Sequence, residues 1–212
     1  MPRQAIQAHA QALQVPYLVH FTQLTNLRSI LENGLLPRSQ FDRLGRGPDI
    51  NDPYRFDRHL DAISLSIAHP NGRMFYRCRQ DRQNVQWVVL AIATSILWSK
   101  QCGFCCNNAA DNRMSALSTW DIQQPSAFYG MFGELEGYKT RQEQRLKPFD
   151  PTDEQAEVLV FDAIQPEFIL GVAFQSEAAK QASAPYCGGR TLVMHGDSKG
   201  LFAARSYLRS RG

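Results

Sequence analysis

The sequence predicts an α+β fold, in which strands and helices interleave along a chain of 212 residues. Two observations support this prediction: apolar runs of strand length recur through the chain, and segments with helical spacing lie between several of them. A Rossmann or P-loop nucleotide site is not favoured, because neither G-x-G-x-x-G nor G-x-x-x-x-G-K-[ST] occurs. Because the length suits one domain and no linker interrupts it, we expect residues 1–212 to form a single domain.

Strands are predicted where apolar residues alternate with polar ones or run on continuously. Ile63, Leu65 and Ile67 alternate with serines, which indicates a half-buried strand. The nearly continuous apolar run from Val85 to Ala93 indicates a central strand. The full set of predicted strands covers residues 17–21, 63–67, 85–93, 156–161, 168–174 and 190–195.

Helices are predicted between these strands. Leu24, Leu27 and Leu31 recur at helical spacing, and Gly34 fits the position just after the last turn. Further helices are expected over residues 3–13, from residue 74, around 113–118, around 126–135, and between the last two strands. Residues 37–61 are rich in Pro, Gly, Asp and Arg, which predicts a long loop, and long loops in compact domains are often functional.

Composition narrows the class of protein. The formal net charge of +3 is too small to identify a nucleic-acid binder. Arginine dominates the 23 cations and suits phosphates better than lysine does, although a GC-rich genome would also favour it. No apolar stretch reaches the roughly 18 residues of a membrane span, and the first residues have no apolar leader, so we expect a cytoplasmic protein.

The cysteines are a candidate metal site. Cys102, Cys105 and Cys106 contain a C-x-x-C, but no second C-x-x-C or paired histidine follows. A structural zinc site needs four ligands. We therefore expect free thiols, mostly buried, and no metal.

Two segments place reactive side chains at strand ends. His20 ends a predicted strand, and a helix start follows it at once; the alternative is a core histidine bonded to the backbone. Glu157 lies within a predicted apolar strand, where burying a carboxylate costs free energy. The alternative for Glu157 is the solvent face of an edge strand.

These two segments also carry recognisable motifs. The first reads Y-x-x-H-F-T-x-x-x-N-L-x-x-I-L-x-x-G-L-L and the second Q-A-E-V-L-V. The pair resembles the DarT group of DNA ADP-ribosyltransferase toxins, from about Tyr17 to Phe174, with residues 95–150 similar only in outline. In that group the first motif binds NAD and the second supplies the catalytic glutamate. The resemblance implies an ADP-ribosyltransferase-like fold, with a central split mixed or antiparallel β-sheet flanked by helices.

The resemblance assigns roles by position. Glu157 matches the catalytic glutamate, and Gln155 gives the Q-x-E arrangement of the substrate loop. A catalytic arginine is expected in the long loop, where Arg55 is the assigned residue; the other candidates there are Arg43, Arg46 and Arg58. The residues expected to bind NAD, the co-substrate, are His20, Thr22, Asn26, Leu27, Met74 and Tyr76, the last two beside the nicotinamide.

The implied activity is transfer of ADP-ribose from NAD to a base of single-stranded DNA, with release of nicotinamide. The shorter loop and the stretch Cys102–Ala110 look closer to the guanine-modifying branch than to the thymidine-modifying one. The implied partner is an antitoxin with ADP-ribosyl-DNA glycohydrolase activity, either NADAR-type or a macrodomain. We expect a monomer. The cations Arg73, Arg77, Arg79 and Arg82 would bind DNA phosphates or, alternatively, form a solvated helix face.

Other functions remain open. An ADP-ribosyltransferase could act on protein or RNA, and a 2′-phosphotransferase-like enzyme would use arginines and a histidine without needing the glutamate. A non-catalytic NAD-binding module would follow if Glu157 faced solvent away from His20. For an enzyme, we expect these two residues on neighbouring central strands, facing one cleft.

Overall fold

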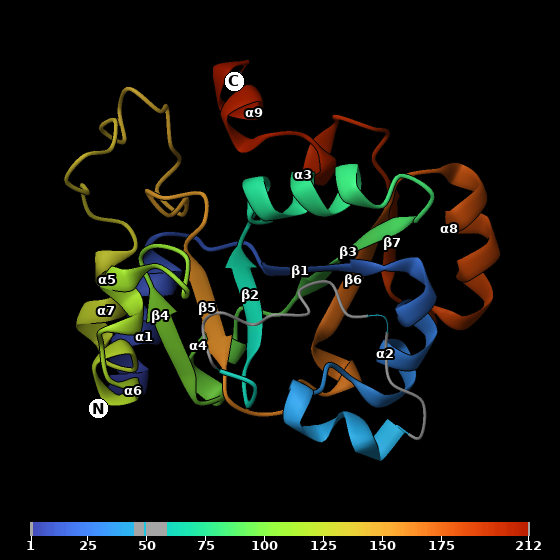
Figure 1. The fold of residues 1–212 in the computed structure, drawn as a ribbon, viewed down its shortest axis with the longest axis horizontal. Coiled ribbons are helices and arrows are strands. Elements are labelled where there is room, and N and C mark those ends of the chain that lie inside the picture. Colours follow the sequence, from blue (N-terminus) through green and yellow to red (C-terminus); the bar gives the residue numbers. More distant parts are fainter. Residues whose placement is uncertain (1, 45–48, 50–58, 212) are drawn as a thin grey trace.

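The structure, a computed structural model, describes residues 2–44, 49 and 59–211. These residues form one mixed β-sheet with helices around it (Figure 1). The strands are β1 (Leu18–Gln23), β2 (Ile63–Ile67), β3 (Trp87–Ile92), β4 (Cys102–Cys105), β5 (Glu157–Val160), β6 (Ile169–Phe174) and β7 (Thr191–Met194). The α-helices are α1 (Pro2–Ala12), α2 (Leu27–Asn33), α3 (Gly72–Asp81), α4 (Ile96–Ser99), α5 (Asn112–Ser115), α6 (Thr119–Ile122), α7 (Pro125–Gly130), α8 (Glu177–Ser183) and α9 (Arg205–Ser210). Short 3-10 helices are η1 (Leu24–Asn26), η2 (Arg38–Leu44), η3 (Pro166–Phe168), η4 (Ala184–Tyr186) and η5 (Gly200–Phe202).

The strand order is β4-β5-β2-β1-β3-β6-β7. Neighbouring strands are antiparallel except β6 and β7, which are parallel. β1 lies at the centre because the next two strands along the chain, β2 and β3, pair on either side of it. The predicted α+β class, with a mixed sheet flanked by helices, is confirmed.

The sheet divides beside β1. Within the described chain, β1 pairs with β3 from Leu18 to Gln23, but with β2 only at Leu18 and Val19. Beyond Val19 the two strands diverge, so the sheet consists of a β4-β5-β2 half and a β1-β3-β6-β7 half. The second half of β1, which carries His20 and Thr22, therefore lies along the division, paired with β3 but not with β2.

Strand alternation sorts the apolar side chains onto two faces. Leu18, Leu90 and Val158 belong to the main core, which also takes in residues of α1, α2 and α7. Val19 and Trp87 face the other way and pack under α3, which crosses the upper end of the sheet in Figure 1. The helices α1, α4 and α7 gather at the β4 end, and α8 lies against β7 (Figure 1).

Helix α2 ends where the sequence predicts. Gly34 has a φ of 83°, in the left-handed region that glycine tolerates, and a Cβ at this position would collide with the carbonyl oxygen of Ile164. This close approach lets Leu35 pair with Ile164 in an isolated bridge. The glycine therefore ties the end of α2 to the segment that follows β5.

The secondary structure of residues 101–155 differs most from the prediction. The strand β4 was not predicted, because Cys102–Cys105 is short, contains a glycine and shows no clear alternation. The helix expected over 126–135 ends at Gly130. Near the C-terminus, α9 was also not predicted, since its sequence is mostly polar. Among the described helices, none is both long and apolar enough to cross a bilayer.

Candidate active site

Glu157 opens β5 and is only 6% exposed. Each of its carboxylate oxygens accepts a hydrogen bond: Ser64 Oγ donates to Oε2 at 2.7 Å, and Asn108 Nδ2 donates to Oε1 at 2.6 Å. Since β5 lies between β4 and β2, the alternative that Glu157 faces solvent on an edge strand is wrong. Hydrogen bonds to both oxygens fix the orientation of this carboxylate, as a group prepared for chemistry requires.

His20 reaches Glu157 through Ser64. Its Nδ1 lies 3.0 Å from the carbonyl oxygen of Ser64, whose hydroxyl donates to the glutamate. The expectation of neighbouring strands is wrong, because β2 lies between β1 and β5. In register, His20 lies level with Leu90 of the main core, and Glu157 lies level with Cys105 of a smaller apolar cluster. The two are connected at the division between the half-sheets, where β1 and β2 have diverged.

Asn26 fixes the backbone next to this division. Its Nδ2 donates to Thr22 Oγ1 at 3.0 Å and to the Asp49 carbonyl oxygen at 2.8 Å, while the Asp49 N–H donates back to Asn26 Oδ1 at 2.8 Å. Thr25 Oγ1 also donates to the Asp49 carboxylate, at 2.5 Å. Thr22 and Asn26 are buried. The asparagine thus anchors residue 49 beside β1, and its contact with NAD stays a prediction.

The loop before β5 is held by a buried polar network. Asp153 is 4% exposed and accepts hydrogen bonds from Asn107 Nδ2 and the Tyr138 hydroxyl, both at 2.9 Å. Its other oxygen accepts the backbone N–H of Gln155 at 2.9 Å. Asn107 is the neighbour of Asn108, so one loop supports both this network and the site glutamate. The backbone of Gln155 is fixed, and its predicted contact with the acceptor stays a prediction.

Two arginines of helix α9, Arg205 and Arg209, bind the start of the same loop, and these contacts are called the α9 clamp. Asp150 is fully buried and receives two hydrogen bonds from Arg209, at 2.6 Å from Nε and 2.7 Å from Nη2. Burial raises the pKa of Asp150, but the hydrogen bonds from Arg209 and from a backbone N–H outweigh it and leave the pKa below its usual value. Arg205, 4% exposed, donates to the carbonyl oxygens of Pro151 at 2.7 Å and Thr152 at 3.3 Å.

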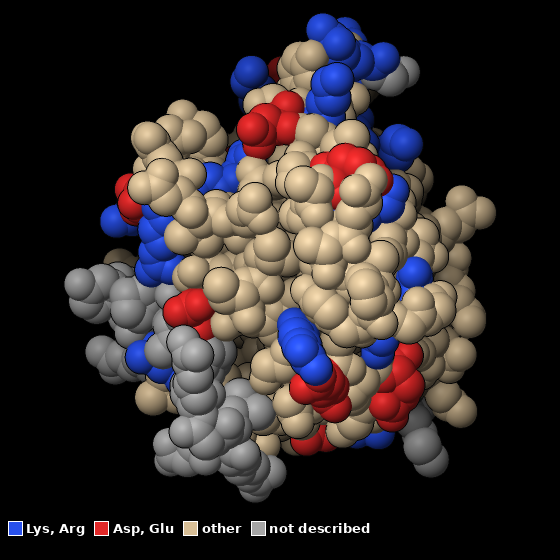
Figure 2. Space-filling model, turned by 90° about the vertical axis from the view of Figure 1, so that its right-hand side faces the viewer, with Lys and Arg blue, Asp and Glu red and all other residues tan. Residues whose placement is uncertain are grey.

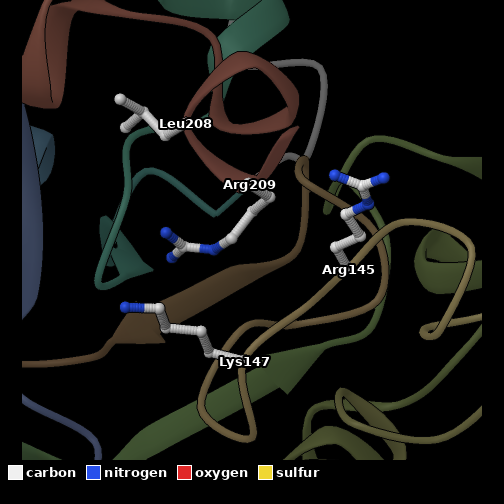
Figure 3. A pocket seen from close by; sticks show the side chains of 4 residues that line it. All are labelled: Arg145, Lys147, Leu208 and Arg209. Atoms are coloured by element: carbon white, nitrogen blue, oxygen red, sulfur yellow. The ribbon is translucent and has the colours of Figure 1, made fainter. Parts of the chain in front are cut away.

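A basic cavity of about 510 Å³ lies beside this clamp. Figure 3 shows Leu208 and Arg209 extending from α9, and Arg145 and Lys147 from the loop next to it. Arg145 also donates to the Ser210 carbonyl oxygen at 3.1 Å. The loop and the C-terminal helix are therefore joined by charged contacts that give this end of the molecule a positive surface.

The remaining residues assigned from the motifs occupy varied positions. Arg55 lies outside the described residues, so its catalytic role stays a prediction. Leu27 is fully buried in the main core, where it packs against other apolar side chains. On α3, Met74 is half-buried and Tyr76 is 60% exposed. Their expected contacts with the nicotinamide also stay predictions.

The arginines of α3 do not share one environment. Arg73 and Arg77 have side chains 75% and 83% exposed, at 3.7 Å from Glu154 and 3.6 Å from Asp81 respectively. Arg79 instead stacks on the aromatic core beneath α3, 4.8 Å from a ring centroid. Exposed pairs of this length contribute little to stability, so Arg73 and Arg77 can release their partners to bind an anion.

The cysteine cluster is part of the sheet. Cys102 and Cys105 are buried in β4, and burial raises the pKa of the Cys102 thiol to about 12. Metals bind the thiolate, which such a pKa disfavours. In the part of the chain that the structure describes, no group of three or more His, Cys, Asp or Glu side chains could hold a metal ion.

Two residues of the site were missed by sequence reasoning. Ser64 belongs to the alternating strand whose serines were interpreted as its polar side, and the 93 residues between it and Glu157 hide their contact. Asn108 lies in the stretch that showed no clear pattern. Neither segment carries a sequence pattern that marks the residue as a partner of Glu157.

The comparison with protein families decides the assignment. The model of DarT, described as ssDNA thymidine ADP-ribosyltransferase, matches residues 19–189, which include His20, Ser64, Asn108 and Glu157. The chain belongs to the DarT family. The family is described as one of ADP-ribosyltransferases, which agrees with the predicted enzyme class. No curated protein sequence matches the chain.

Solved structures of DarT proteins share the fold. Thermosipho africanus DarTG in complex with ADP-ribose has a TM-score of 0.59 at 16% identity, covering 88% of this chain and 51% of its own, so the present chain spans about half of that protein. Thermus sp. 2.9 DarT in complex with ADP-ribosylated ssDNA has a TM-score of 0.56 at 13% identity, covering 87% of this chain and 96% of its own. The same Thermus protein with NAD+ gives 0.53 at 13% identity, covering 87% and 97%.

The branch predicted within the DarT group is not supported. The family model that matches is described for thymidine, and nothing in these comparisons points to guanine. The loop length and the cysteine-containing stretch, on which the guanine interpretation depended, are features of this chain that do not identify a base.

Proposed function

We propose that this DarT-family protein transfers ADP-ribose from NAD to a base of single-stranded DNA and releases nicotinamide. The observation that carries the proposal is the buried carboxylate of Glu157, hydrogen-bonded by Ser64 and Asn108 at the division of the sheet. Such a carboxylate suits a reaction in which positive charge develops on a ribose.

The reaction breaks the bond between the nicotinamide nitrogen and ribose C1′, and the electron pair leaves with the nicotinamide. C1′ acquires oxocarbenium-like positive charge until a nitrogen of the DNA base supplies a new electron pair. Glu157 offsets that charge and accepts a hydrogen bond from the ribose 2′-OH. It also takes the proton that the attacking base nitrogen loses.

The other assigned residues bind and orient. His20 and Thr22 would contact the ribose of NAD along the diverging part of β1, and Asn26 holds Thr22 and residue 49 in place. Arg55 would contact the phosphates of NAD or the scissile region. Gln155, whose backbone is fixed by Asp153, would face the acceptor base. An unpaired base avoids the cost of extrusion from a duplex, which favours single-stranded DNA.

The base and the partners belong to the same proposal. Thymine is the first base to test, since the matching family model is described for thymidine. A cognate antitoxin that removes ADP-ribose from DNA, of NADAR or macrodomain type, is proposed as the partner. A similar structure is that of a DarTG protein, and this chain spans about half of it. We further propose that the toxin itself acts as a monomer in the cytoplasm.

The test is an incubation with labelled NAD and single-stranded oligonucleotides that each contain one type of reactive base. Matched RNA oligonucleotides and a mixture of proteins serve as the other acceptors. Label on DNA, together with nicotinamide release that Glu157→Gln abolishes, is the expected result. Label confined to protein or RNA overturns the DNA substrate, and preference for guanine over thymine reverses the choice of base.

A further inference from the structure

A second cavity, of about 740 Å³, lies on the side of α3 that faces α9. Its walls come from α3, the start of β3, the segment after β7, and α9. Among the side chains that line it are Tyr76, Arg79, Gln80, Trp87, Phe202 and Tyr207. None of the roles proposed above for Glu157, His20 or the division of the sheet uses this cavity.

Flat aromatic side chains line both the mouth and the depth of this cavity. Tyr76 and Tyr207 are 60% and 44% exposed, whereas Trp87 and Phe202 are each 1% exposed. Arg211 stacks over Tyr207, 4.5 Å from its ring centroid. An aromatic slot with a cation beside it favours a flat ring attached to an anionic group.

Two buried donors in the cavity have no acceptor among the described residues. They are the indole Nε1 of Trp87 and the guanidinium Nε of Arg79. Arg79 is held in place, because its Nη2 donates to the Phe202 carbonyl oxygen at 3.0 Å. A buried N–H without a partner is unfavourable, so a ligand with carbonyl oxygens or ring nitrogens would satisfy both donors. Asp197, fixed by Gln175 Nε2 at 2.9 Å, offers an acceptor to an amino group.

The walls of the cavity connect directly to the loop that precedes Glu157. A Cβ at Gly72, where α3 begins, would lie 3.1 Å from Glu154 Oε2, so α3 starts against that loop. Arg205 of α9 binds the carbonyl oxygens of Pro151 and Thr152 in the same loop. The two helices that wall the cavity, α3 and α9, therefore both contact the loop that precedes Glu157.

The surrounding charge fits an anionic strand. Arg73 and Arg77 are exposed on α3, and Arg211 follows α9. Figure 2 shows Lys and Arg side chains gathered at the upper end of the molecule, where α9 lies in Figure 1.

We propose that this cavity binds a nucleobase of the DNA substrate, a nucleotide that flanks the modified one. The ring stacks between Tyr76 and Tyr207, and its polar edge accepts hydrogen bonds from Trp87 and Arg79. This inference rests on the proposed function, since it assigns a second contact for the same substrate. It also gives Tyr76 a DNA base to contact in place of the nicotinamide.

The first experiment measures the affinity for fluorescent single-stranded oligonucleotides of increasing length, without NAD. For oligonucleotides long enough to span both sites, Tyr207→Ala should weaken binding about tenfold, the effect of losing one stacked base. Tyr207→Phe keeps the ring and should bind as the wild type does. Tyr129→Ala removes an exposed aromatic side chain from α7, at the β4 end of the sheet, and should leave affinity unchanged.

A second experiment uses the wild-type protein and needs no substitution. An oligonucleotide carrying 4-thiothymidine at positions around the modified base is photocrosslinked to the wild-type protein, and the joined peptides are identified by mass spectrometry. Crosslinks from a flanking position to peptides that contain Tyr76, Trp87 or Tyr207 support the proposal. Crosslinks confined to other peptides overturn it, as does a Tyr207→Ala variant with wild-type affinity at every length.

The outcomes separate this inference from the proposed function. If the wild type modifies DNA but neither experiment involves the cavity, the cavity inference fails and the function stands. If the wild type modifies no DNA, the proposed function fails whatever the cavity binds. If Tyr207→Ala loses affinity for a purified antitoxin and not for DNA, the cavity is a protein-docking site and the nucleobase is excluded.

Discussion

Two carboxylates seven positions apart in the sequence, Asp150 and Glu157, are both buried but held in different ways. Asp150 is paired with Arg209 through two hydrogen bonds and is fully enclosed. Glu157 accepts hydrogen bonds from Ser64 and Asn108, which carry no charge. The first arrangement neutralises a carboxylate in order to fix the backbone, and the second fixes the direction of a carboxylate by means of dipoles.

The difference separates stability from catalysis along one short segment. An ion pair of this kind is costly to break, because removing one partner leaves the other charge buried. Hydrogen bonds from uncharged donors such as Ser64 and Asn108 orient a carboxylate without neutralising its charge. Changes at Asp150 should therefore mainly affect folding, and changes at Glu157 should mainly affect the reaction.

The largest effect is expected at Glu157. Glu157→Gln removes the charge that offsets the developing cation on the ribose, and the rate of DNA modification should fall by about 100-fold or more. NAD affinity, measured by calorimetry, should change far less, because the charge acts in the transition state. Glu154→Gln, a carboxylate change in the same loop, is the control and should keep its activity. Near-normal modification by Glu157→Gln would remove the glutamate from the mechanism.

The next effect concerns stability. Asp150→Asn leaves the Arg209 guanidinium, 14% exposed, without its counter-charge, and the free energy of unfolding should fall by about 3 kcal/mol. Asp162→Asn breaks the Lys100 pair, whose acid is 54% exposed, and should cost less than about 1 kcal/mol. Urea unfolding of both variants makes the comparison. Equal losses would show that the α9 clamp is no stronger than a surface pair.

A smaller effect depends on pH. Burial lowers the pKa of His69 to about 4, against 6.5 when unfolded. Between these pH values His69 is protonated in the unfolded chain but neutral in the folded one. The free energy of unfolding therefore declines as pH falls from about 6.5 to about 4. The loss between pH 7 and pH 5 should be about 2 kcal/mol. Asp150 does not contribute in this range, because its lowered pKa acts only at more acidic pH.

The measurement is urea unfolding at pH 7 and pH 5 for the wild type and His69→Gln. The substituted protein should lose much less stability over this interval. An unchanged slope would assign the pH dependence to other groups.

The smallest effect is expected at Asn108. Asn108→Ala removes one hydrogen bond that orients Glu157 and should slow DNA modification by about tenfold, with little change in NAD affinity. Asn108→Asp brings a second carboxylate to the glutamate and should raise its pKa, which moves the acidic limb of the pH–rate profile upward. A slower Asn108→Asp enzyme with an unmoved profile would indicate a structural role alone.

A site residue could be predicted when its signal lay within a few positions of sequence, and not when it depended on contacts between distant segments. His20 and Glu157 were identified because each lies within a local motif, a strand that leads into a helix and an apolar strand with an acid at its start. Ser64 and Asn108 were missed, because they contact Glu157 across 93 and 49 residues of sequence and their own segments show no distinguishing pattern. The expected neighbouring strands were wrong for the same reason, since nothing local shows that β2 enters between β1 and β5.

By itself, the sequence determined the class of fold, most of its strands and helices, the family motifs and the acid at the start of β5. These depend on periodicity, turn residues and short motifs, which act over a few positions. Only the tertiary structure decided the strand order, the division beside β1, the clamp by α9 and the partners of Glu157. Those features arise from pairing between distant segments, whose choice depends on how all the apolar faces are buried together.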